Sequence, residues 1–345
     1  MCTQAILILS VLCFVLAWFL TRAVRSYAVQ TNLLDQPNER SSHTVATPRG
    51  GGAAIVAAFF AALVVMAIGD YVSKRLLAAL GGACTVVAVL GFLDDRRGLS
   101  AKLRILGHAA AATWALAWIG PLPPVTFLNF TVGFGLAASI VCAIYVVWSI
   151  NMFNFMDGID GIAGLEAISV GLGGALVWWI VQPSADWPVA VVFAASVGGF
   201  LVWNFPTARI FMGDAGSGVL GLVVAVLALW SSHSAPHLFW CWPILTGCFM
   251  VDATTTLIRR VLRGERFYQA HRHHAFQYAA RKHRSHKAVS LSVLAINTLW
   301  LLPVAVAVAS QWLAGSAGVA LAYAPLLWLA LHYKAGDRAA QGVLA

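Results

Sequence analysis

The stretch NMFNFMDGIDGIAG, from Asn151 to Gly164, sets two asparagines and two aspartates between two apolar runs. Residues 136–150 lead into it and residues 162–181 lead out of it. A run of about 20 apolar residues spans the hydrocarbon core of a bilayer. Asp157 and Asp160 are therefore predicted to lie at a membrane surface, where a lipid head group is accessible, and not in the middle of a span.

The rest of the chain has the composition of a membrane protein. Of its 345 residues, 60% are hydrophobic and 10% are charged, and the mean hydropathy is +0.81. A soluble domain cannot bury so much apolar surface, and long apolar segments in lipid must be helices. The sequence predicts an all-α polytopic membrane protein, a single domain over residues 1–345, with about eleven transmembrane helices near residues 4–22, 51–69, 76–93, 104–120, 135–151, 161–181, 188–204, 216–232, 238–257, 288–309 and 316–332.

Basic residues fall almost entirely on one side of this predicted arrangement. If the chain crosses at every span, all lysines and arginines except Lys74 and Arg75 lie in loops on one side. By the positive-inside rule those loops are cytoplasmic, the N-terminus is outside and the C-terminus is cytoplasmic. The net charge of +9 reflects this asymmetry and indicates no nucleic-acid partner. Residues 125–133 are expected to form a short hairpin on the outer side.

Two candidate sites lie in the first cytoplasmic loops. Arg49 precedes three glycines at the predicted start of the second span, where backbone N–H groups and a guanidinium can approach an anion. An ordinary loop with a glycine-rich helix start is the alternative. Asp94 and Asp95 end the third span, and adjacent carboxylates suit metal binding or proton abstraction. A solvated helix end neutralised by Arg96 and Arg97 would give the same pattern.

Asn154, Asp157 and Asp160 recur every third residue, which on a helix places them on one face. Gly158 and Gly161 allow a tight turn instead, and a helix cap formed by Asp157 is a third interpretation. So many polar side chains within so apolar a chain favour a functional site.

Asp214 follows Gly213 at the predicted start of the eighth span, beyond Asn204 at the end of the seventh. The positive end of the helix dipole favours an ionised carboxylate there. Mg2+ takes one or two such oxygens and keeps most of its waters. Asp214 is therefore a candidate metal ligand, with a plain N-cap as the alternative.

Histidines mark the longest cytoplasmic loop. His271, His273 and His274 lie among basic residues, without cysteines or an HExxH pattern. A cationic rim for a pyrophosphate is therefore favoured over a zinc site. A basic amphipathic loop lying on anionic lipid is the alternative.

These acids, amides and histidines all map to the same predicted face. A secondary transporter would gather its polar residues near the middle of the membrane. The sequence shows no such midspan cluster apart from Asp252, which is expected to pair with Arg259 or Arg260. Convergence on one surface instead fits an enzyme that joins a soluble anionic substrate to a membrane-held one.

Taken in order, these motifs resemble those of the polyprenyl-phosphate N-acetylhexosamine-1-phosphate transferases, glycosyltransferase family 4. The resemblance runs over residues 35–290 and rests on TPRGG (47–51), LDD (93–95), the stretch 151–164, Asn204 with FMGDAG (211–216), and HRHH (271–274). Residues 38–43 and 252–274 are most similar to the branch that initiates O-antigen synthesis. Ala275 departs from the three consecutive histidines of the muramoyl-pentapeptide branch.

The resemblance implies a reaction and a location. Undecaprenyl phosphate would attack the sugar-bearing phosphorus of a UDP-N-acetylamino sugar directly, releasing UMP, with Mg2+ or Mn2+ as cofactor. The enzyme would lie in a bacterial inner membrane, as a monomer or homodimer, and would initiate O-antigen or a related cell-envelope polysaccharide. The competing interpretation is a membrane transporter of nucleotide sugars or lipid-linked anions.

The resemblance also assigns roles to residues. Asp214 is expected to be the main Mg2+ ligand, with Asn154 in the metal shell. Asp94 is expected to act as a base or to position the lipid phosphate, with Asp95 as its partner, which makes these three acids the catalytic candidates. The residues expected to bind substrate are Arg49, Lys102, Asn154, Asp157, Asp160, Asn204, His271, His273 and His274.

Overall fold

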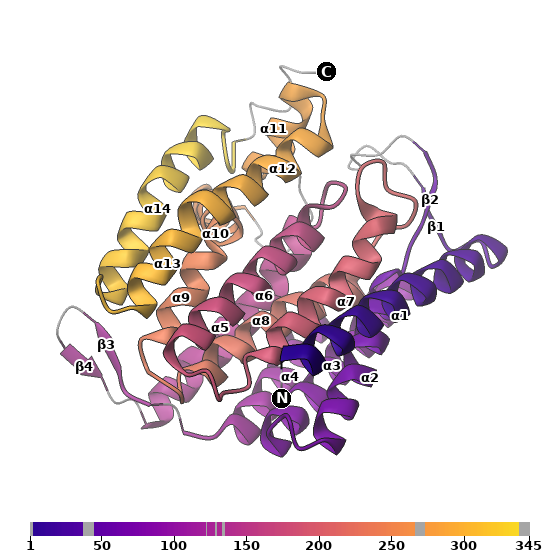
Figure 1. Cartoon of the computed structure of the whole chain (residues 1–345). Helices are drawn as coiled ribbons and strands as arrows, with labels where there is room; N and C mark the ends of the chain where they lie inside the picture. Colours follow the sequence, from indigo (N-terminus) through magenta and orange to yellow (C-terminus); the bar gives the residue numbers. More distant parts are fainter. Residues whose placement is uncertain are drawn as a thin grey trace.

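The computed structural model describes residues 3–36, 45–121, 123–127, 130–132, 135–265 and 273–337. Over these residues the chain is a bundle of helices with two short hairpins (Figure 1). The helices are α1 (Thr3–Gln30), α2 (Gly52–Ile68), α3 (Lys74–Arg97), α4 (Ala101–Ile119), α5 (Gly135–Met156), α6 (Ile162–Val181), α7 (Pro188–Asn204), α8 (Asp214–Ser231), α9 (Leu238–Leu245), α10 (Gly247–Leu262), α11 (Ala275–His283), α12 (His286–Ile296), the π-helix η1 (Asn297–Leu301), α13 (Leu302–Ala309) and α14 (Gly315–His332).

A helix lies at each range predicted as a span. Within the described residues, seven helical stretches are long and apolar enough to cross a membrane, or up to eight if the bent pair α9–α10 counts as one. One of the seven, His286–Ala309, combines α12, η1 and α13, while α2 and α7 are shorter apolar helices. The predicted all-α membrane class is confirmed.

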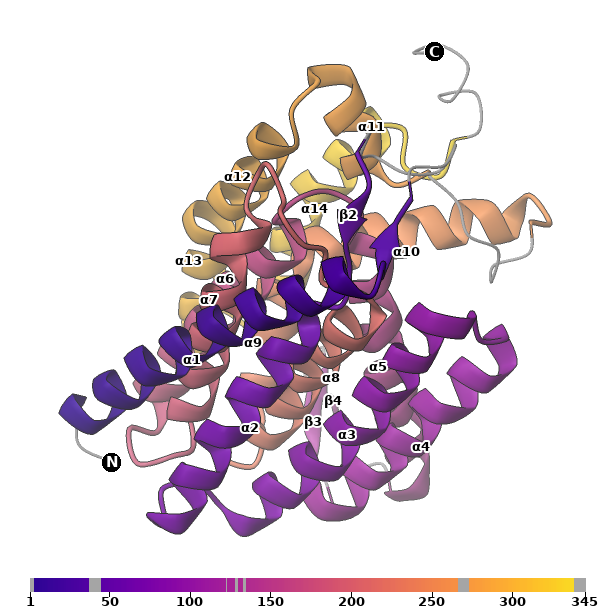
Figure 2. The same ribbon diagram turned by 90° about the vertical axis from the view of Figure 1, so that its right-hand side faces the viewer.

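The ninth predicted span is not one uninterrupted helix. Its two parts, α9 and α10, are bent by 70° at Thr246. Pro243 has no N–H to bond within α9, and the Thr246 hydroxyl donates to the carbonyl of Trp242 at 2.9 Å. Both features weaken the helical ladder at this point. As a result α10 turns aside and projects from the bundle (Figure 2).

Helix α8 lies at the centre of the bundle, and nearly all of its residues are buried. Small residues bring its neighbours close. A Cβ at Gly221 would lie 2.2 Å from the Ser149 carbonyl oxygen of α5, and the Ser149 hydroxyl donates to the Gly221 carbonyl at 2.8 Å. In lipid, such close backbone approach is a main source of helix association. The start of α8, which carries Asp214, is thereby fixed against its neighbours.

Two antiparallel hairpins lie towards opposite ends of the bundle (Figure 1). One pairs β1 (Leu34–Asp35) with β2 (Thr47–Pro48), and the other pairs β3 (Val125–Phe127) with β4 (Phe130–Val132). The second hairpin confirms the one predicted at residues 125–133. The first lies at the end of the bundle that carries α11 and the candidate site residues.

Candidate active site

Two loops that are far apart in the sequence meet through their backbones. The Phe211 N–H donates to the Pro48 carbonyl at 2.8 Å, and the N–H groups of Gly51 and Gly52 donate to the carbonyls of Phe211 and Met212 at 2.9 and 2.8 Å. The prediction that these glycine N–H groups approach an anion is therefore wrong, because protein carbonyls accept from them. Their bonds instead join the start of α2 to the start of α8.

Glycines also let three helices converge at this point. A Cβ at Gly52 would lie 2.2 Å from the Cα of Gly216, and a Cβ at Gly91 would lie 2.5 Å from the Cα of Ala215. No side chain can be accommodated at such distances without movement of the backbone. The start of α2 and the end of α3 therefore both reach the start of α8.

Arg49 lies between two of the predicted acids. Its Nη2 is 2.7 Å from Asp95 Oδ1 and 2.9 Å from Asp214 Oδ1. Asp95 Oδ1 also accepts from the Asp214 N–H at 3.0 Å, at the start of α8. The side chain of Asp95 is 5% exposed and that of Asp214 is 28% exposed. The cluster therefore opens to its surroundings at Asp214.

The second oxygen of Asp95 has a different environment. Oδ2 is buried and has no hydrogen-bond partner among the residues that the structure describes. A Cβ at Gly213 would lie 2.5 Å from it, and Gly213 has a φ of +77°. A buried carboxylate oxygen without a donor is costly. This oxygen is thus available to a cation.

Asp94 is held by α4. Its Oδ1 accepts from the Leu99 N–H at 2.6 Å and its Oδ2 lies 3.2 Å from Arg104 Nη1. The sequence suggested Arg96 as a neutralising partner, but Arg96 lies over the ring of Phe92 at 4.5 Å. Sequence reasoning missed Arg104 as a site residue. The available signal was Ser100, whose hydroxyl caps α4 and so sets Arg104 in its first turn.

The tight-turn interpretation holds for the central stretch. Helix α5 ends at Met156, and Gly161 has a φ of +75° before α6 begins. Asp157 and Asp160 therefore lie in a turn and do not share one helical face. Asn154 is still within α5, where its Oδ1 accepts from the Ser217 hydroxyl of α8 at 2.6 Å.

Asp157 faces the acid cluster. Burial raises the pKa of its carboxyl to about 7, and the negative charge of Asp214 adds to the rise while Arg49 opposes it. The carboxylates of Asp95 and Asp160 raise the pKa further. Asp157 therefore changes its charge close to neutral pH.

Asp160 lies in a neighbouring pocket and not between Asp94 and Asp214. Its Oδ2 accepts from the Ala208 N–H at 3.0 Å, and its Oδ1 is 3.4 Å from His286 Nδ1. The pocket has a volume of about 700 Å³, and its basic lining comes from separate segments: Arg25, Arg209, Arg284, His286 and Lys287.

Asn204 joins the loops around these two sites. Its Oδ1 accepts from the Gly161 N–H at 3.0 Å and its Nδ2 donates to the Ile210 carbonyl at 2.9 Å. It is buried, so both ends of its amide are used by the backbone. Lys102, by contrast, is exposed in the first turn of α4. Substrate contacts by either residue stay predictions.

His274 caps α11 and lies against Asp252. Its Nδ1 is 3.4 Å from Asp252 Oδ1, and the N–H groups of Ala275 and Phe276 donate to the same carboxylate at 2.9 and 3.0 Å. The expectation that Asp252 pairs with Arg259 or Arg260 is wrong. The N-terminus of α11, with its positive dipole end, is the partner. Next to it, the His273 carbonyl accepts from the Gly336 N–H at 2.6 Å.

The two arginines of α10 have other partners. Arg260 lies 2.9 Å from Glu265, and Arg259 donates to the Ala335 carbonyl at 2.7 Å. His271 lies outside the described residues, so its predicted role stays a prediction.

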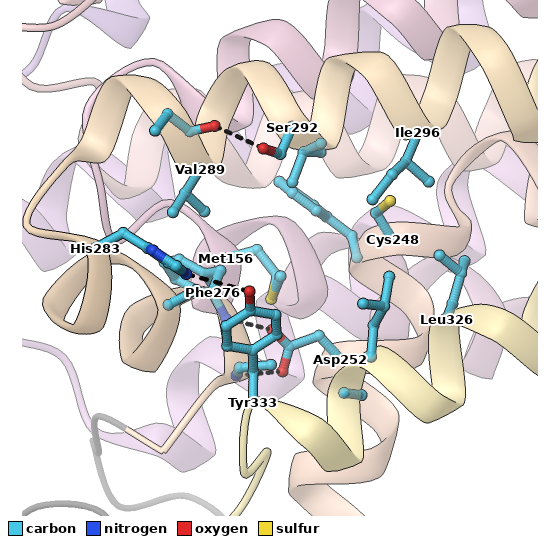
Figure 3. Close-up of a pocket in the computed structure, with 17 residues that line it drawn as sticks. Met156, Cys248, Asp252, Phe276, His283, Val289, Ser292, Ile296, Leu326 and Tyr333 are labelled. Carbon is cyan, nitrogen blue, oxygen red and sulfur yellow. Dashed lines mark hydrogen bonds between the residues drawn. The ribbon is translucent and has the colours of Figure 1, made fainter.

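An apolar pocket of about 640 Å³ lies behind Asp252. It is lined by α10, α11, α12 and α14, with Met156 from the end of α5. His283 and Tyr333, joined by a 3.2 Å contact, lie with Asp252 at one end, and Ile296 and Leu326 lie at the other (Figure 3). The pocket thus has a polar end beside His274 and an apolar end within the bundle.

Comparison with known proteins gives this arrangement a family. The profile of glycosyl transferase family 4 matches residues 76–232. A probable undecaprenyl-phosphate N-acetylglucosaminyl 1-phosphate transferase of Bacillus subtilis is 31% identical over 306 residues, which cover 82% of this chain and 83% of that protein. The decaprenyl-phosphate N-acetylglucosaminephosphotransferase of Mycobacterium tuberculosis is 30% identical over 336 residues, which cover 86% of this chain and 80% of that protein.

The chain belongs to the polyprenyl-phosphate N-acetylhexosamine-1-phosphate transferases of glycosyl transferase family 4. The resemblance carried by its motifs is confirmed, and the transporter interpretation is set aside. A phospho-N-acetylmuramoyl-pentapeptide-transferase of Frankia alni is also similar, at 30% identity over 288 residues that cover 69% of this chain and 79% of that protein.

The transferase should need glycine at position 213 because a side chain there would displace the Asp95 carboxylate. Gly213→Ala would place a Cβ 2.5 Å from Asp95 Oδ2 at a φ of +77°. We expect UMP release to fall by at least about tenfold because the carboxylate must move. Gly98→Ala is the matched control, since Gly98 also has a positive φ, +65°, but nothing within 4 Å of the added Cβ. Equal losses in both variants would mean that backbone strain alone is responsible.

Asp157 should make the stability of the transferase depend on pH. The folded protein holds the Asp157 proton more tightly than the unfolded chain, in which the pKa is about 3.9. Ionisation therefore costs stability as the pH rises from about 4 through about 7. We expect the unfolding midpoint of Asp157→Asn, measured in detergent with a chelator, to fall less between pH 5 and pH 8 than that of the wild type.

Asp70→Asn is the control for this measurement, because Asp70 is exposed in the turn after α2. It should keep the pH dependence of the wild type. The prediction fails if Asp157→Asn does the same.

Proposed function

We propose that this transferase moves N-acetylglucosamine 1-phosphate from UDP-N-acetylglucosamine to undecaprenyl phosphate or a similar polyprenyl phosphate, releasing UMP. The names of the two relatives that match over four fifths of their length carry this proposal. This donor is more specific than the one predicted from the sequence, which was any UDP-N-acetylamino sugar. The product would begin a cell-envelope polymer, and O-antigen as that polymer stays a prediction.

The direct test is a substrate panel. Purified protein is incubated with Mg2+, undecaprenyl phosphate and several UDP-amino sugars, and UMP is followed. Release of UMP with UDP-N-acetylglucosamine but not with UDP-N-acetylgalactosamine supports the proposal. Release only with another amino sugar would contradict the donor while leaving the reaction class intact.

The acid cluster suits Mg2+ or Mn2+ by its donor chemistry. Asp95 Oδ2 is buried without a partner among the described residues, Asp214 is partly exposed, and Asn154 supplies an amide oxygen on the adjoining helix. Among the residues described, no three His, Cys, Asp or Glu side chains are grouped to hold an ion by themselves. Mg2+ commonly uses one or two carboxylates together with water and phosphate. Asp214, with Asn154 and Asp95, would hold it, and the ion would shield the phosphates of the two substrates.

Asp94 is better suited to positioning than to proton abstraction. Both of its oxygens have partners, the Leu99 N–H and Arg104. A phosphate monoester has a second pKa of about 6 and is largely dianionic at neutral pH. The lipid phosphate therefore needs no base before it attacks the sugar-bearing phosphorus. Asp94 would hold Arg104 where that phosphate approaches, and direct attack remains our expectation.

The basic pocket beside Asp160 is suited to the nucleotide. Arg209 and Arg284 supply positive charge from two loops and Lys287 supplies it from the first turn of α12, and the aromatic residue Phe211 also lines the pocket. A nucleoside diphosphate offers both a base that stacks and phosphates that need cations. The pocket shares Pro48 and Phe211 with the backbone contact that positions Arg49, so a nucleotide there would lie next to the acid cluster.

We further propose one membrane domain over residues 1–345 with eleven spans and the site on the cytoplasmic side of a bacterial inner membrane. The helices α2, α4 and α7 would complete the count beyond the stretches that satisfy the length and hydropathy criteria. The asymmetry of the basic residues supports the orientation.

Asp214→Asn should abolish turnover while the protein stays folded. Loss of the charge at the exposed carboxylate of the cluster is expected to lower kcat by at least about a hundredfold. It should also weaken Mn2+ binding measured by electron paramagnetic resonance without substrates. Asp70→Asn again serves as the control. Wild-type Mn2+ affinity together with high activity at saturating Mg2+ would remove Asp214 from the metal shell.

The apolar pocket behind Asp252 would take part of the polyprenyl chain. Ser292→Trp should fill it from α12, because Ser292 lines it and is exposed. We expect the KM for undecaprenyl phosphate to rise about tenfold, as for a loss of about 1.4 kcal/mol in binding, with the KM for the nucleotide sugar unchanged. Ala295→Trp, exposed on the same helix but outside the pocket lining, is the control. Equal KM values for the lipid in both variants would exclude this pocket.

A further inference from the structure

A carboxyl group lies inside the bundle, apart from the active site. Glu166, in the second turn of α6, is 0% exposed. Its Oε2 accepts from the amide Nδ2 of Asn297 at 2.6 Å, and the same nitrogen donates to the Ser169 hydroxyl at 2.8 Å. Asn297 is itself buried and begins the π-helix η1. No cation is paired with Glu166 among the described residues.

The other two oxygens of this pair carry the argument. Glu166 Oε1 and Asn297 Oδ1 are both buried, and neither has a hydrogen-bond partner among the described residues. Both amide protons of Asn297 are already used, by Glu166 and Ser169. An ionised carboxylate here would be an unpaired charge in an apolar interior, which is strongly unfavourable. Two acceptors without a donor would add a further cost.

One proton removes both difficulties. We infer that Glu166 is carried as a neutral acid, with its proton on Oε1 and donated to Asn297 Oδ1. Together with the existing bond from Nδ2 to Oε2, this closes a ring of two hydrogen bonds between an acid and an amide. Every polar atom of the pair then has a partner, as buried polar groups require.

The pair joins the elements that surround the break between α9 and α10. The α6 residues Gly173 and Gly174 pack on α9: a Cβ at Gly173 would lie 2.9 Å from Leu245, and one at Gly174 would lie 2.5 Å from Trp242. Gly247, at the start of α10, faces Leu301 of η1. The backbone N–H of Phe249, in the first turn of α10, is directed at the Glu166 carboxyl, although it makes no hydrogen bond to Oε1. Glu166 and Asn297 therefore fasten α6 to η1 where α10 changes direction.

The direction of α10 matters because it carries Asp252. Asp252 holds His274 and the N-terminus of α11, and Asp252 and Ala275 line the pocket described above. Glu166 and Asn297 are therefore positioning residues: they act on the site through α10. This inference rests on the proposed function only for its activity assay. Two of its measurements need no turnover.

Variants separate a neutral pair from a charged one. Glu166→Gln keeps the shape and replaces the acid–amide ring by an amide–amide ring, so UMP release should stay within twofold of the wild type. Asn297→Asp alone would put two acids together and should lower kcat at least tenfold. Combining Glu166→Gln with Asn297→Asp exchanges acid and amide and should restore activity, an interaction that a double-mutant cycle measures.

Infrared spectroscopy reports the proton directly. The wild type minus Glu166→Gln difference spectrum should contain a protonated carboxyl C=O band at pH 5 that persists at pH 7. Absence of that band, or loss of activity in Glu166→Gln equal to that in Glu166→Ala, would overturn the neutral pair.

Glu166→Ala tests the positioning role and should lower kcat per folded molecule at least tenfold. A lowered unfolding midpoint with unchanged kcat would overturn that role. If the wild type shows the band but transfers no sugar phosphate, the proposed function fails and the neutral pair does not.

Discussion

The site depends on one guanidinium held between carboxylates. Arg49 lies within 2.9 Å of both Asp95 and Asp214. Carboxylates brought together with little water repel one another and favour protonation, so an arrangement of this kind needs a cation. Arg49 can supply it only because residues 48–52 are bonded through their backbones to residues 211–212. Electrostatic balance at the site is thus a consequence of a loop contact between the two halves of the bundle.

Packing of small residues makes that contact available. Gly52, Gly91 and Gly216 let α2, α3 and α8 converge, and Gly218 and Gly221 let α8 approach α3 and α5. Lipid does not drive helices together by the hydrophobic effect, so close van der Waals packing must do so. The glycines of α8 therefore serve stability and the site at once, because they fix the helix whose first residue is Asp214.

The sequence was sufficient to predict the helices, but not which residues of separate helices contact one another. Hydropathy predicted a helix at each range where the structure has one, because lipid dictates length and apolar character. The Gly213–Asp214 pair correctly marked the start of α8. The 70° break could not be predicted, because transmembrane helices often accommodate a proline without breaking. Arg104 was missed, and Asp252 was given the wrong partner, because both depend on how separate helices meet. The N–H groups of Gly51 and Gly52 were misread because a sequence does not tell a ligand from a carbonyl of the same chain.

Asp157 and Glu166 show how the surroundings of a carboxyl group decide its role. Asp157 lies in a turn among charged groups, and burial with those charges brings the pKa of its carboxyl to about 7. Its charge can therefore follow pH and the arrival of an anion or a cation. Glu166 is enclosed by helices, and its side-chain contact is a neutral amide. A group without access to water or to charge has no reason to change state during turnover, so the bend that directs α10 can stay fixed while the acid cluster responds to its substrates.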